Sequence, residues 1–285
     1  MRSMTWMELG LLALSANWIP LLLGFDRIGP FLGRLCGAIL TCAPGKKERH
    51  AMNMAPDDAV AIPLWVNGRA FLTVTDSFFD VADPQTGKVL HCIPLCGPDE
   101  AGEAAGAARA ALPAWSALDA ARRQALLAAL ADALAGYAPH FAKLIGQETG
   151  FAEAAAAAEV AAAIAALRGA APAGSGGVAA IVTDAGHPLA ALAQVAAPLL
   201  AGGATVVCKP SPQASAAAFA LCELSARAGW PAGVLNLLQG DKAAIEALCD
   251  APAVDRMVYA GEAGLGDKIA AIAGQRGKAL TRISA

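Results

Sequence analysis

The residue of this sequence best placed to do chemistry is a lysine at the end of a short apolar run. Residues 204–208, ATVVC, are rich in β-branched side chains and predict a buried strand, which Lys209 ends. Pro210 and Pro212 follow, and neither can donate a hydrogen bond to a neighbouring strand, so the strand cannot extend further. We therefore expect the side chain of Lys209 to be aimed beyond the strand end. A solvated lysine at a strand end is the alternative.

After residue 172, short apolar stretches that predict strands alternate with stretches that predict helices. This alternation indicates where in the fold Lys209 lies. Strands are expected at 177–182, 204–209, 233–240, 255–261 and 278–284, and helices at 188–201, 213–228, 241–250 and 264–273. Strands separated by helices of this length form a parallel sheet with right-handed crossovers. The sequence thus predicts an α/β fold, an open, doubly wound, Rossmann-like sheet of about five parallel strands. Such sheets bind ligands beyond the carboxyl ends of their strands, where Lys209 is expected.

The residues before this sheet predict a hairpin followed by helices. An Asn-Gly pair at 67–68 lies between apolar runs, as in a two-residue hairpin turn, and DPQTG at 83–87 marks a second turn. Pro98, Asp99 and Glu100 predict the start of a helix, because the two acidic residues complement the helix dipole in its first turn. A capped helix is expected over 119–137, and the alanine-rich stretch 151–168 predicts another.

These patterns divide the chain into three parts. Residues 1–55 form an apolar extension and a linker, for which GKKERH at 45–50 is the polar break. Residues 56–170 hold the hairpin and the helices, and residues 171–285 hold the Rossmann-like sheet. PAGSGG at 172–177 is expected to be a flexible joint between them.

Residues 9–25, LGLLALSANWIPLLLGF, form the one membrane-like stretch. It is shorter than the ~20 apolar residues that a spanning helix needs, and it contains Asn17 and Pro20, so a membrane role is disfavoured. Two alternatives stay open. The stretch could be a helical extension that covers apolar surface, or translation could start at Met52 or Met54.

Composition argues against several classes of protein. The chain has 285 residues, is 56% hydrophobic and carries a net charge of −3, so it can bury a sizeable core and has no basic patch for nucleic acid. Its seven scattered cysteines favour reduced thiols in a cytoplasmic protein. His91, Cys92 and Cys96 could be drawn as a metal site, but without a fourth ligand they are better explained as buried residues. We expect no metal.

The ordered series of motifs resembles the aldehyde dehydrogenase superfamily over residues 63 to about 282. The stretches that carry the resemblance are WVNGR (65–69), DPQTGKVL (83–90), LAGGATVVCKPS (200–211), GWPAGVLNLLQGD (229–241) and VDRMVYAG (254–261). The resemblance is to the N-terminal, NAD(P)-binding half of that family. The chain also resembles the second, degenerate unit that some long family members carry.

The resemblance implies a cofactor site. Lys209 would donate to the hydroxyls of the adenine ribose of NAD or NADP, Ser211 would assist, and Gly240 and Gly261 would belong to the same site. Many members have a glutamate directly after K-P-S, where its carboxylate accepts from the ribose. Pro212 stands there in this chain, so the choice between NAD and NADP stays open.

The chain departs from the family pattern where chemistry is done. Gly186 stands where the family has the asparagine that stabilises the oxyanion, and Ile283 stands at the position of the catalytic glutamate. Glu262 replaces the serine that faces the pyrophosphate, where a carboxylate would repel a phosphate. His187 is expected to be structural. None of the cysteines matches the nucleophile, and the catalytic domain would lie beyond Ala285, so we expect no catalytic residue in this chain.

Three hypotheses about function follow. The first is a truncated, aldehyde dehydrogenase-like protein without catalysis of its own, which has a weak or vestigial NAD(P) site and binds an intact aldehyde dehydrogenase or a second copy of itself. The second is an NAD(P)-dependent aldehyde oxidoreductase that works only with a partner that supplies the cysteine and the glutamate. The third is a gene remnant.

Overall fold

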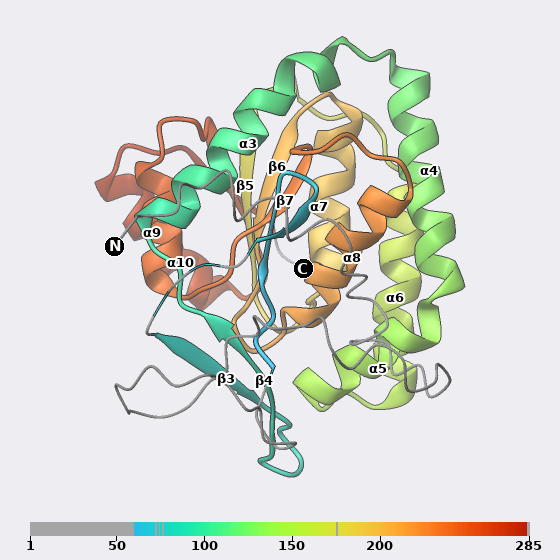
Figure 1. Cartoon of the computed structure of the whole chain (residues 1–285), viewed down its shortest axis with the longest axis vertical. Coiled ribbons are helices and arrows are strands. Elements are labelled where there is room, and N and C mark those ends of the chain that lie inside the picture. Colours follow the sequence, from blue (N-terminus) through green and yellow to red (C-terminus); the bar gives the residue numbers. More distant parts are fainter. Residues whose placement is uncertain (1–59, 72, 74, 76, 175, 284–285) are drawn as a thin grey trace, which may run out of the picture. The chain divides into compact units, whose positions relative to one another are not determined.

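A computed structural model describes residues 60–71, 73, 75, 77–174 and 176–283 of the chain. Within these residues the central feature is a mixed sheet of seven strands in the order β2-β1-β7-β6-β5-β8-β9 (Figure 1). Its parallel strands are β5 (Val178–Thr183), β6 (Thr205–Lys209), β7 (Leu235–Leu237), β8 (Arg256–Ala260) and β9 (Leu280–Ile283). The predicted α/β sheet of five parallel strands is therefore confirmed. A hairpin of β1 (Leu64–Val66) and β2 (Arg69–Phe71) extends it by antiparallel pairing with β7.

The strand order places a topological switch point in the middle of the sheet. From β5 the chain steps outward through β6 to β7, and it then returns to the other side of β5 to form β8 and β9. β5 and β8 are parallel neighbours that end together, with Thr183 beside Ala260. Because the connections that follow these two strands lead away in opposite directions, a crevice is expected beyond their carboxyl ends.

Helices cover both faces of the sheet (Figure 1). One face is covered by α3 (Pro98–Ala117), α9 (Lys242–Asp250) and α10 (Ala263–Gln275), and the other by α7 (Ala190–Ala201) and α8 (Ala216–Arg227). A further layer packs on α7 and α8 and consists of α4 (Ala120–Gly136), α5 (Ala138–Thr149) and α6 (Glu153–Arg168). The predicted helices thus all occur, each beginning and ending within about three residues of its expected bounds.

Helix α5 was not predicted from the sequence. Gly136 ends α4, and α5 begins at Ala138 with Pro139 in its first turn, so the chain bends by 73° between the two helices. No single helix among the described residues is long and apolar enough to cross a membrane, although α4 and α5 taken together have the length and composition of a broken span.

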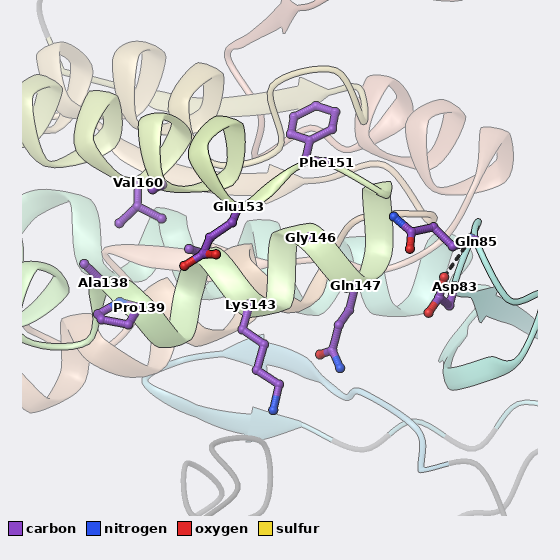
Figure 2. A pocket seen from close by; sticks show the side chains of 12 residues that line it. Asp83, Gln85, Ala138, Pro139, Lys143, Gly146, Gln147, Phe151, Glu153 and Val160 are labelled. Carbon is purple, nitrogen blue, oxygen red and sulfur yellow. Dashed lines mark hydrogen bonds between the residues drawn. The ribbon is translucent and has the colours of Figure 1, made fainter.

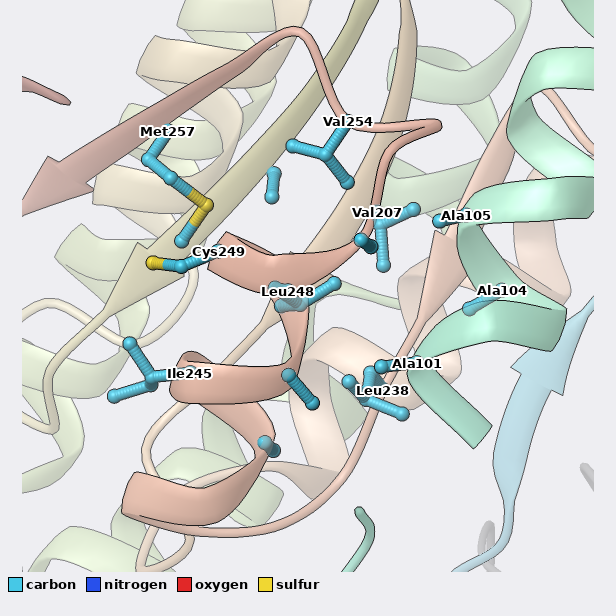
Figure 3. Close-up of a cluster of buried hydrophobic side chains, with 14 of the residues drawn as sticks. Ala101, Ala104, Ala105, Val207, Leu238, Ile245, Leu248, Cys249, Val254 and Met257 are labelled. Carbon is cyan, nitrogen blue, oxygen red and sulfur yellow. The ribbon is translucent and has the colours of Figure 1, made fainter. Parts of the chain in front are cut away.

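Alanines allow α3 to approach the sheet closely. Ala101, Ala104, Ala105 and Ala108 recur at helical spacing and form its buried face. The buried cluster that this face joins also contains Val207, Leu238, Ile245, Leu248 and Met257 (Figure 3). The small side chains let one helix contact both the sheet and α9, so the alanine content of this chain builds a core as well as helices.

The β1–β2 hairpin is fixed to the sheet by a buried asparagine. Asn67 and Gly68 both have positive φ, 54° and 75°, as a two-residue hairpin turn requires. The Asn67 backbone N–H donates to Oδ1 of Asn236 in β7 at 3.0 Å, and Nδ2 of Asn236 donates to the Gly233 carbonyl at 2.7 Å. The predicted turn at 83–87 joins β3 (Phe78–Ala82) to β4 (Val89–Pro94), which form a separate two-stranded sheet.

The predicted joint at 172–177 is held by hydrogen bonds at its described residues. The Ala173 N–H donates to the Pro198 carbonyl at 2.9 Å, and the Arg256 guanidinium donates to the Gly176 carbonyl at 2.7 Å. The helical part and the sheet part lie in the same compact unit. The predictions for residues 1–55, including the apolar stretch at 9–25, the linker at 45–50 and the alternative start sites, lie outside the described residues.

Candidate functional site

Lys209 is the last residue of β6 and is buried. It lies beside Val182 of β5 in the parallel register, and its side chain is on the same face of the sheet as Val207, because side chains alternate along a strand. The residue is only 3% exposed, which excludes the alternative of a solvated lysine. Among the described residues it makes no hydrogen bond and no ion pair.

The surroundings of Lys209 disfavour its charged form. Burial lowers the pKa of its ammonium from the usual 10.5 to about 8, and the carboxylate of Asp241 opposes part of this shift. Asp241 is the N-cap of α9, where it accepts a hydrogen bond from the Ala243 N–H at 3.0 Å. The amine makes no hydrogen bond to the described residues, and ligand hydroxyls are suitable acceptors for its donors.

Ser211 and Gly240 have local roles in the structure. Oγ of Ser211 accepts a hydrogen bond from the Gln213 N–H at 3.3 Å within the turn that follows β6. Gly240 has a φ of 121°, and a Cβ at this position would lie 3.0 Å from the backbone nitrogen of Cys96. The glycine is therefore required for close packing of two connections.

A carboxylate lies against the backbone turn at Gly261. Gly261 follows β8 directly, and a Cβ there would lie 2.2 Å from Oδ2 of Asp184. The same oxygen accepts a hydrogen bond from the backbone N–H of Glu262, the N-cap of α10, at 2.6 Å. Asp184 follows β5 directly, so its carboxylate bridges the two strands at the switch point.

Further donors hold the Asp184 carboxylate in this position. Oδ1 accepts from the Gly186 N–H at 3.0 Å, and the Tyr259 hydroxyl donates to Oδ2 at 3.4 Å. Burial, with the neighbouring Asp184 carboxylate, raises the pKa of the Tyr259 hydroxyl above its usual value, so this hydroxyl remains a donor. The side chain of Glu262 is exposed and forms no cap hydrogen bond, so Asp184 rather than Glu262 takes the anion position at α10.

Each of the four helices that follow β5, β6, β7 and β8 begins at a carboxylate. Glu159 accepts from the Ala190 N–H of α7 and Glu148 from the Ala216 N–H of α8, both at 3.1 Å, while Asp241 and Asp184 accept from N–H groups at the starts of α9 and α10. Sequence reasoning missed Glu148, Glu159 and Asp184 as capping residues. The only signals were acidic residues within apolar helices and one acidic residue directly after a buried strand.

Two histidines lie against these buried carboxylates. Nδ1 of His187 lies 2.6 Å from Glu159, and Nε2 of His91 lies 2.8 Å from Glu148. The predicted structural role of His187 agrees with this contact. His91 and the two nearby cysteines belong to no cluster of three or more potential metal ligands anywhere in the described part of the chain.

The cysteines that the structure describes are poor nucleophiles. All five are buried: Cys92, Cys96, Cys208, Cys222 and Cys249. Burial raises the pKa of Cys96 to about 12, with Glu100 adding to the shift, and burial also raises the pKa of Cys222 and Cys249. Cys208 precedes Lys209, but its Sγ lies 3.0 Å from the Asn236 carbonyl within the core. Cys36 and Cys42 lie outside the described residues.

A hollow of about 640 Å³ lies elsewhere, between the β3–β4 turn, α5 and α6 (Figure 2). Its polar residues are Asp83, Gln85, Lys143, Gln147 and Glu153. In Figure 2 the side chains of Lys143 and Gln147 point in a different direction from that of Glu153. The hollow contains neither Lys209 nor Asp184, and its polar groups do not converge, so we place the candidate site at the strand ends.

The sequence matches the model of the aldehyde dehydrogenase family over residues 71–176 and 175–283. The chain belongs to the aldehyde dehydrogenase family. It is 31% identical over 227 residues to the NADP(+) succinate-semialdehyde dehydrogenase of Escherichia coli, a match that covers 72% of this chain and 47% of that protein. It is 32% identical over 198 residues to the glutarate-semialdehyde dehydrogenase of Pseudomonas putida, a match that covers 62% of this chain and 41% of that protein.

Solved aldehyde dehydrogenases share this fold. The lactaldehyde dehydrogenase of Escherichia coli superposes with a TM-score of 0.72 and 26% identity over 78% of this chain and 51% of that chain. A mutant of aldehyde dehydrogenase C from Pseudomonas syringae, solved with NAD+ and octanal, superposes with a TM-score of 0.71 and 25% identity. That match covers 78% of this chain and 50% of that chain. The chain thus spans about half the length of the relatives that it matches.

The residues present fit only part of the dinucleotide that the family implies. The unpaired donors of Lys209 fit ribose hydroxyls. The turn at Gly261 does not fit a pyrophosphate, because the Asp184 carboxylate already accepts the N–H of Glu262 and carries charge of the same sign.

Proposed function

We propose that this chain is an aldehyde dehydrogenase-like nucleotide-binding unit that holds NAD or NADP weakly, turns over no aldehyde by itself, and acts by associating with a partner. The partner is a second copy or an intact aldehyde dehydrogenase. The observation that carries the proposal is Lys209, a buried amine with unused donors at the carboxyl end of β6. The related aldehyde dehydrogenase C of Pseudomonas syringae was solved with NAD+, which supports the same class of ligand.

The lack of turnover is supported by the groups that surround the strand ends. Gly186 offers no side chain as an oxyanion donor, and the described cysteines are buried thiols. Covalent oxidation of an aldehyde requires a thiolate, a donor for the oxyanion and a base for the deacylating water. The described cysteines are all buried, and Ile283 stands at the position of the family's catalytic glutamate.

Association is supported by the edge of the sheet at β9. This strand pairs only with β8 among the described strands, and Ile283 on it is 42% exposed. Leu265, at the start of the adjacent α10, is 37% exposed. An open strand edge with apolar side chains beside it is a surface on which another chain can pack.

Titration calorimetry with NAD+, NADP+ and adenosine tests the nucleotide site. We expect weak binding by the natural chain, with a Kd of roughly 0.1 to 1 mM. Binding by Lys209→Met is expected to be at least tenfold weaker, because the variant lacks the ammonium donors. Lys88→Met, which alters an exposed lysine in the β3–β4 turn, serves as the matched control and is expected to bind like the natural chain.

Two results would contradict the proposal. Equal binding by the natural chain and the Lys209 variant would remove Lys209 from the site. Reduction of NAD+ or NADP+ by the isolated chain in the presence of any aldehyde, followed by absorbance at the nicotinamide band, would show that it has catalytic groups of its own.

A further inference from the structure

A carboxylate lies across the switch point of the sheet, between the ends of β5 and β8. Asp184 follows β5 and Glu262 lies two residues after β8, and these are the two strands between which a ligand of an open α/β sheet enters. The Asp184 carboxylate spans them with the 2.6 Å hydrogen bond to the Glu262 N–H. This N–H belongs to the N-cap residue of α10, at the helix end where an anion would bind.

The Asp184 carboxylate occupies the space over the turn and carries the same sign of charge as a phosphate. Its Oδ2 lies within 2.2 Å of where a Cβ on Gly261 would stand, so it fills the volume over the turn. A phosphate in this place would have to displace a carboxylate that three donors hold, those of Glu262, Gly186 and Tyr259. The exposed side chain of Glu262 adds a second negative charge beside the same turn.

The other polar group near the switch point is the ammonium of Lys209. Lys209 is on β6, on the opposite side of β5 from β8, and its ammonium has no partner among the described residues. Its donors suit vicinal hydroxyl groups such as those of a ribose. The site therefore combines a donor for hydroxyls with an internal anion at the phosphate position.

We propose that Asp184 is a specificity-determining residue that excludes phosphate from this crevice, so that the chain selects a ribose-bearing ligand without phosphate, such as a nucleoside, over a dinucleotide. This inference rests on the proposed function for the ribose position only. The exclusion of phosphate is a separate property of the turn between β8 and α10, and it can be measured without a nucleotide.

The test measures binding of adenosine, NAD+ and inorganic pyrophosphate to the natural chain, Asp184→Asn and Asp184→Ala, by calorimetry and by thermal shift. We expect the natural chain to bind adenosine at least as tightly as NAD+ and not to bind pyrophosphate. Asp184→Asn keeps an oxygen acceptor at this turn while it removes the charge. It can therefore be measured even if Asp184→Ala does not fold. Both variants are expected to bind NAD+ about tenfold more tightly and to be stabilised by pyrophosphate, with adenosine affinity unchanged.

Asp267→Ala is the matched control, because it removes one exposed negative charge from the same helix α10 at a distance from its N-terminus. An equal gain in NAD+ affinity in this variant would show a general charge effect and would overturn the inference. Unchanged NAD+ and pyrophosphate binding in both Asp184 variants would overturn it too, while the proposed function would stand if Lys209→Met still loses adenosine. Pyrophosphate binding by the Asp184 variants without any nucleoside binding would support the phosphate exclusion and contradict the proposed function.

Discussion

At the scale of single residues, the chain places a buried cation, Lys209, at the end of β6 and a half-buried anion, Asp184, at the end of the neighbouring β5. Lys209 is almost fully buried, and the carboxylate that acts on its charge is that of Asp241 at the start of α9. Such a lysine destabilises the folded state when it is charged, because the Asp241 carboxylate compensates its desolvation only in part. Its place at a strand end therefore favours a role in binding over a role in stability.

The lowered pKa of Lys209 predicts a pH dependence of stability. The folded-state pKa, about 8, is below the unfolded value of 10.5, so the unfolded chain binds more protons between these values and stability rises with pH across that window. Below pH 8 the full penalty is present, roughly 3 kcal/mol at the limit of this shift. Lys209→Met lacks it. Urea unfolding of both proteins at pH 7 and pH 10 is the measurement. Relative to the variant, the natural chain is expected to have a higher free energy of unfolding at pH 10 than at pH 7. A constant difference between the two proteins would contradict the pKa.

Residue types identified Lys209 in advance, whereas they did not identify Asp184. The lysine is visible because prolines follow it and fix the end of its strand. The partner of Asp184 is 78 residues away in the sequence, at Glu262. No local pattern links the two positions, and only the pairing of β5 with β8 brings them together.

At the scale of elements, the N-termini of helices determine which carboxylates lie near the carboxyl ends of the strands. The first N–H groups of a helix have no partner within the helix, and here carboxylates from other elements accept them at α7, α8 and α10. At α7 and α8 these contacts connect the outer layer of helices to the helices that cover the sheet. In Glu159 of α6, one carboxylate oxygen accepts from the Ala190 N–H of α7, and the other lies 2.6 Å from Nδ1 of His187. The outer layer of helices is thereby joined to the inner one.

Removal of the Glu159 carboxylate is expected to destabilise the fold. Glu159→Ala leaves the buried Ala190 N–H without its acceptor, which costs about 1–3 kcal/mol, whereas Glu159→Gln keeps an acceptor and is expected to cost less. Glu153→Ala is the matched control, because Glu153 is exposed on the same helix and is expected to change stability by less than about 0.5 kcal/mol. Denaturant unfolding measures all three variants. Equal effects at the two positions would argue against the cap.

Helix α5 shows the limit of local patterns at this scale. The helix predicted over 119–137 does end there, at Gly136, and no helix was predicted directly after it. A new helix begins after only one intervening residue because Phe141, Leu144 and Ile145 are buried. Burial against neighbouring elements decided this helix, which no local pattern predicted.

At the scale of the whole molecule, the sheet ends on one side at the hairpin and on the other at β9. The hairpin is short and is fixed by Asn236, so that edge is protected. The β9 edge carries exposed Ile283, and exposed Leu265 lies on the adjacent α10. The proposed association with a second copy is assigned to this edge.

A charge on β9 is expected to weaken self-association. We predict that Ile283→Lys raises the apparent Kd of the dimer at least tenfold in light scattering after size exclusion, because a lysine on an edge strand opposes pairing. Val89→Lys, at a similarly exposed position in β4, is the control and is expected to leave association unchanged. A natural chain that stays monomeric at high concentration would contradict the self-association proposal and leave an intact aldehyde dehydrogenase as the partner to test.

The sequence by itself determined the alternation of strands and helices, the end of β6 at Lys209 and the family, because these depend on local periodicity, turn residues and ordered motifs. The tertiary structure alone decided that Lys209 is buried without a partner among the described residues and that Asp184 lies across the switch point on the α10 turn. Both facts depend on strands that are distant in sequence and adjacent in the sheet. For the same reason the anion expected from Glu262 is supplied by Asp184, since a helix start binds whichever carboxylate the fold brings to it.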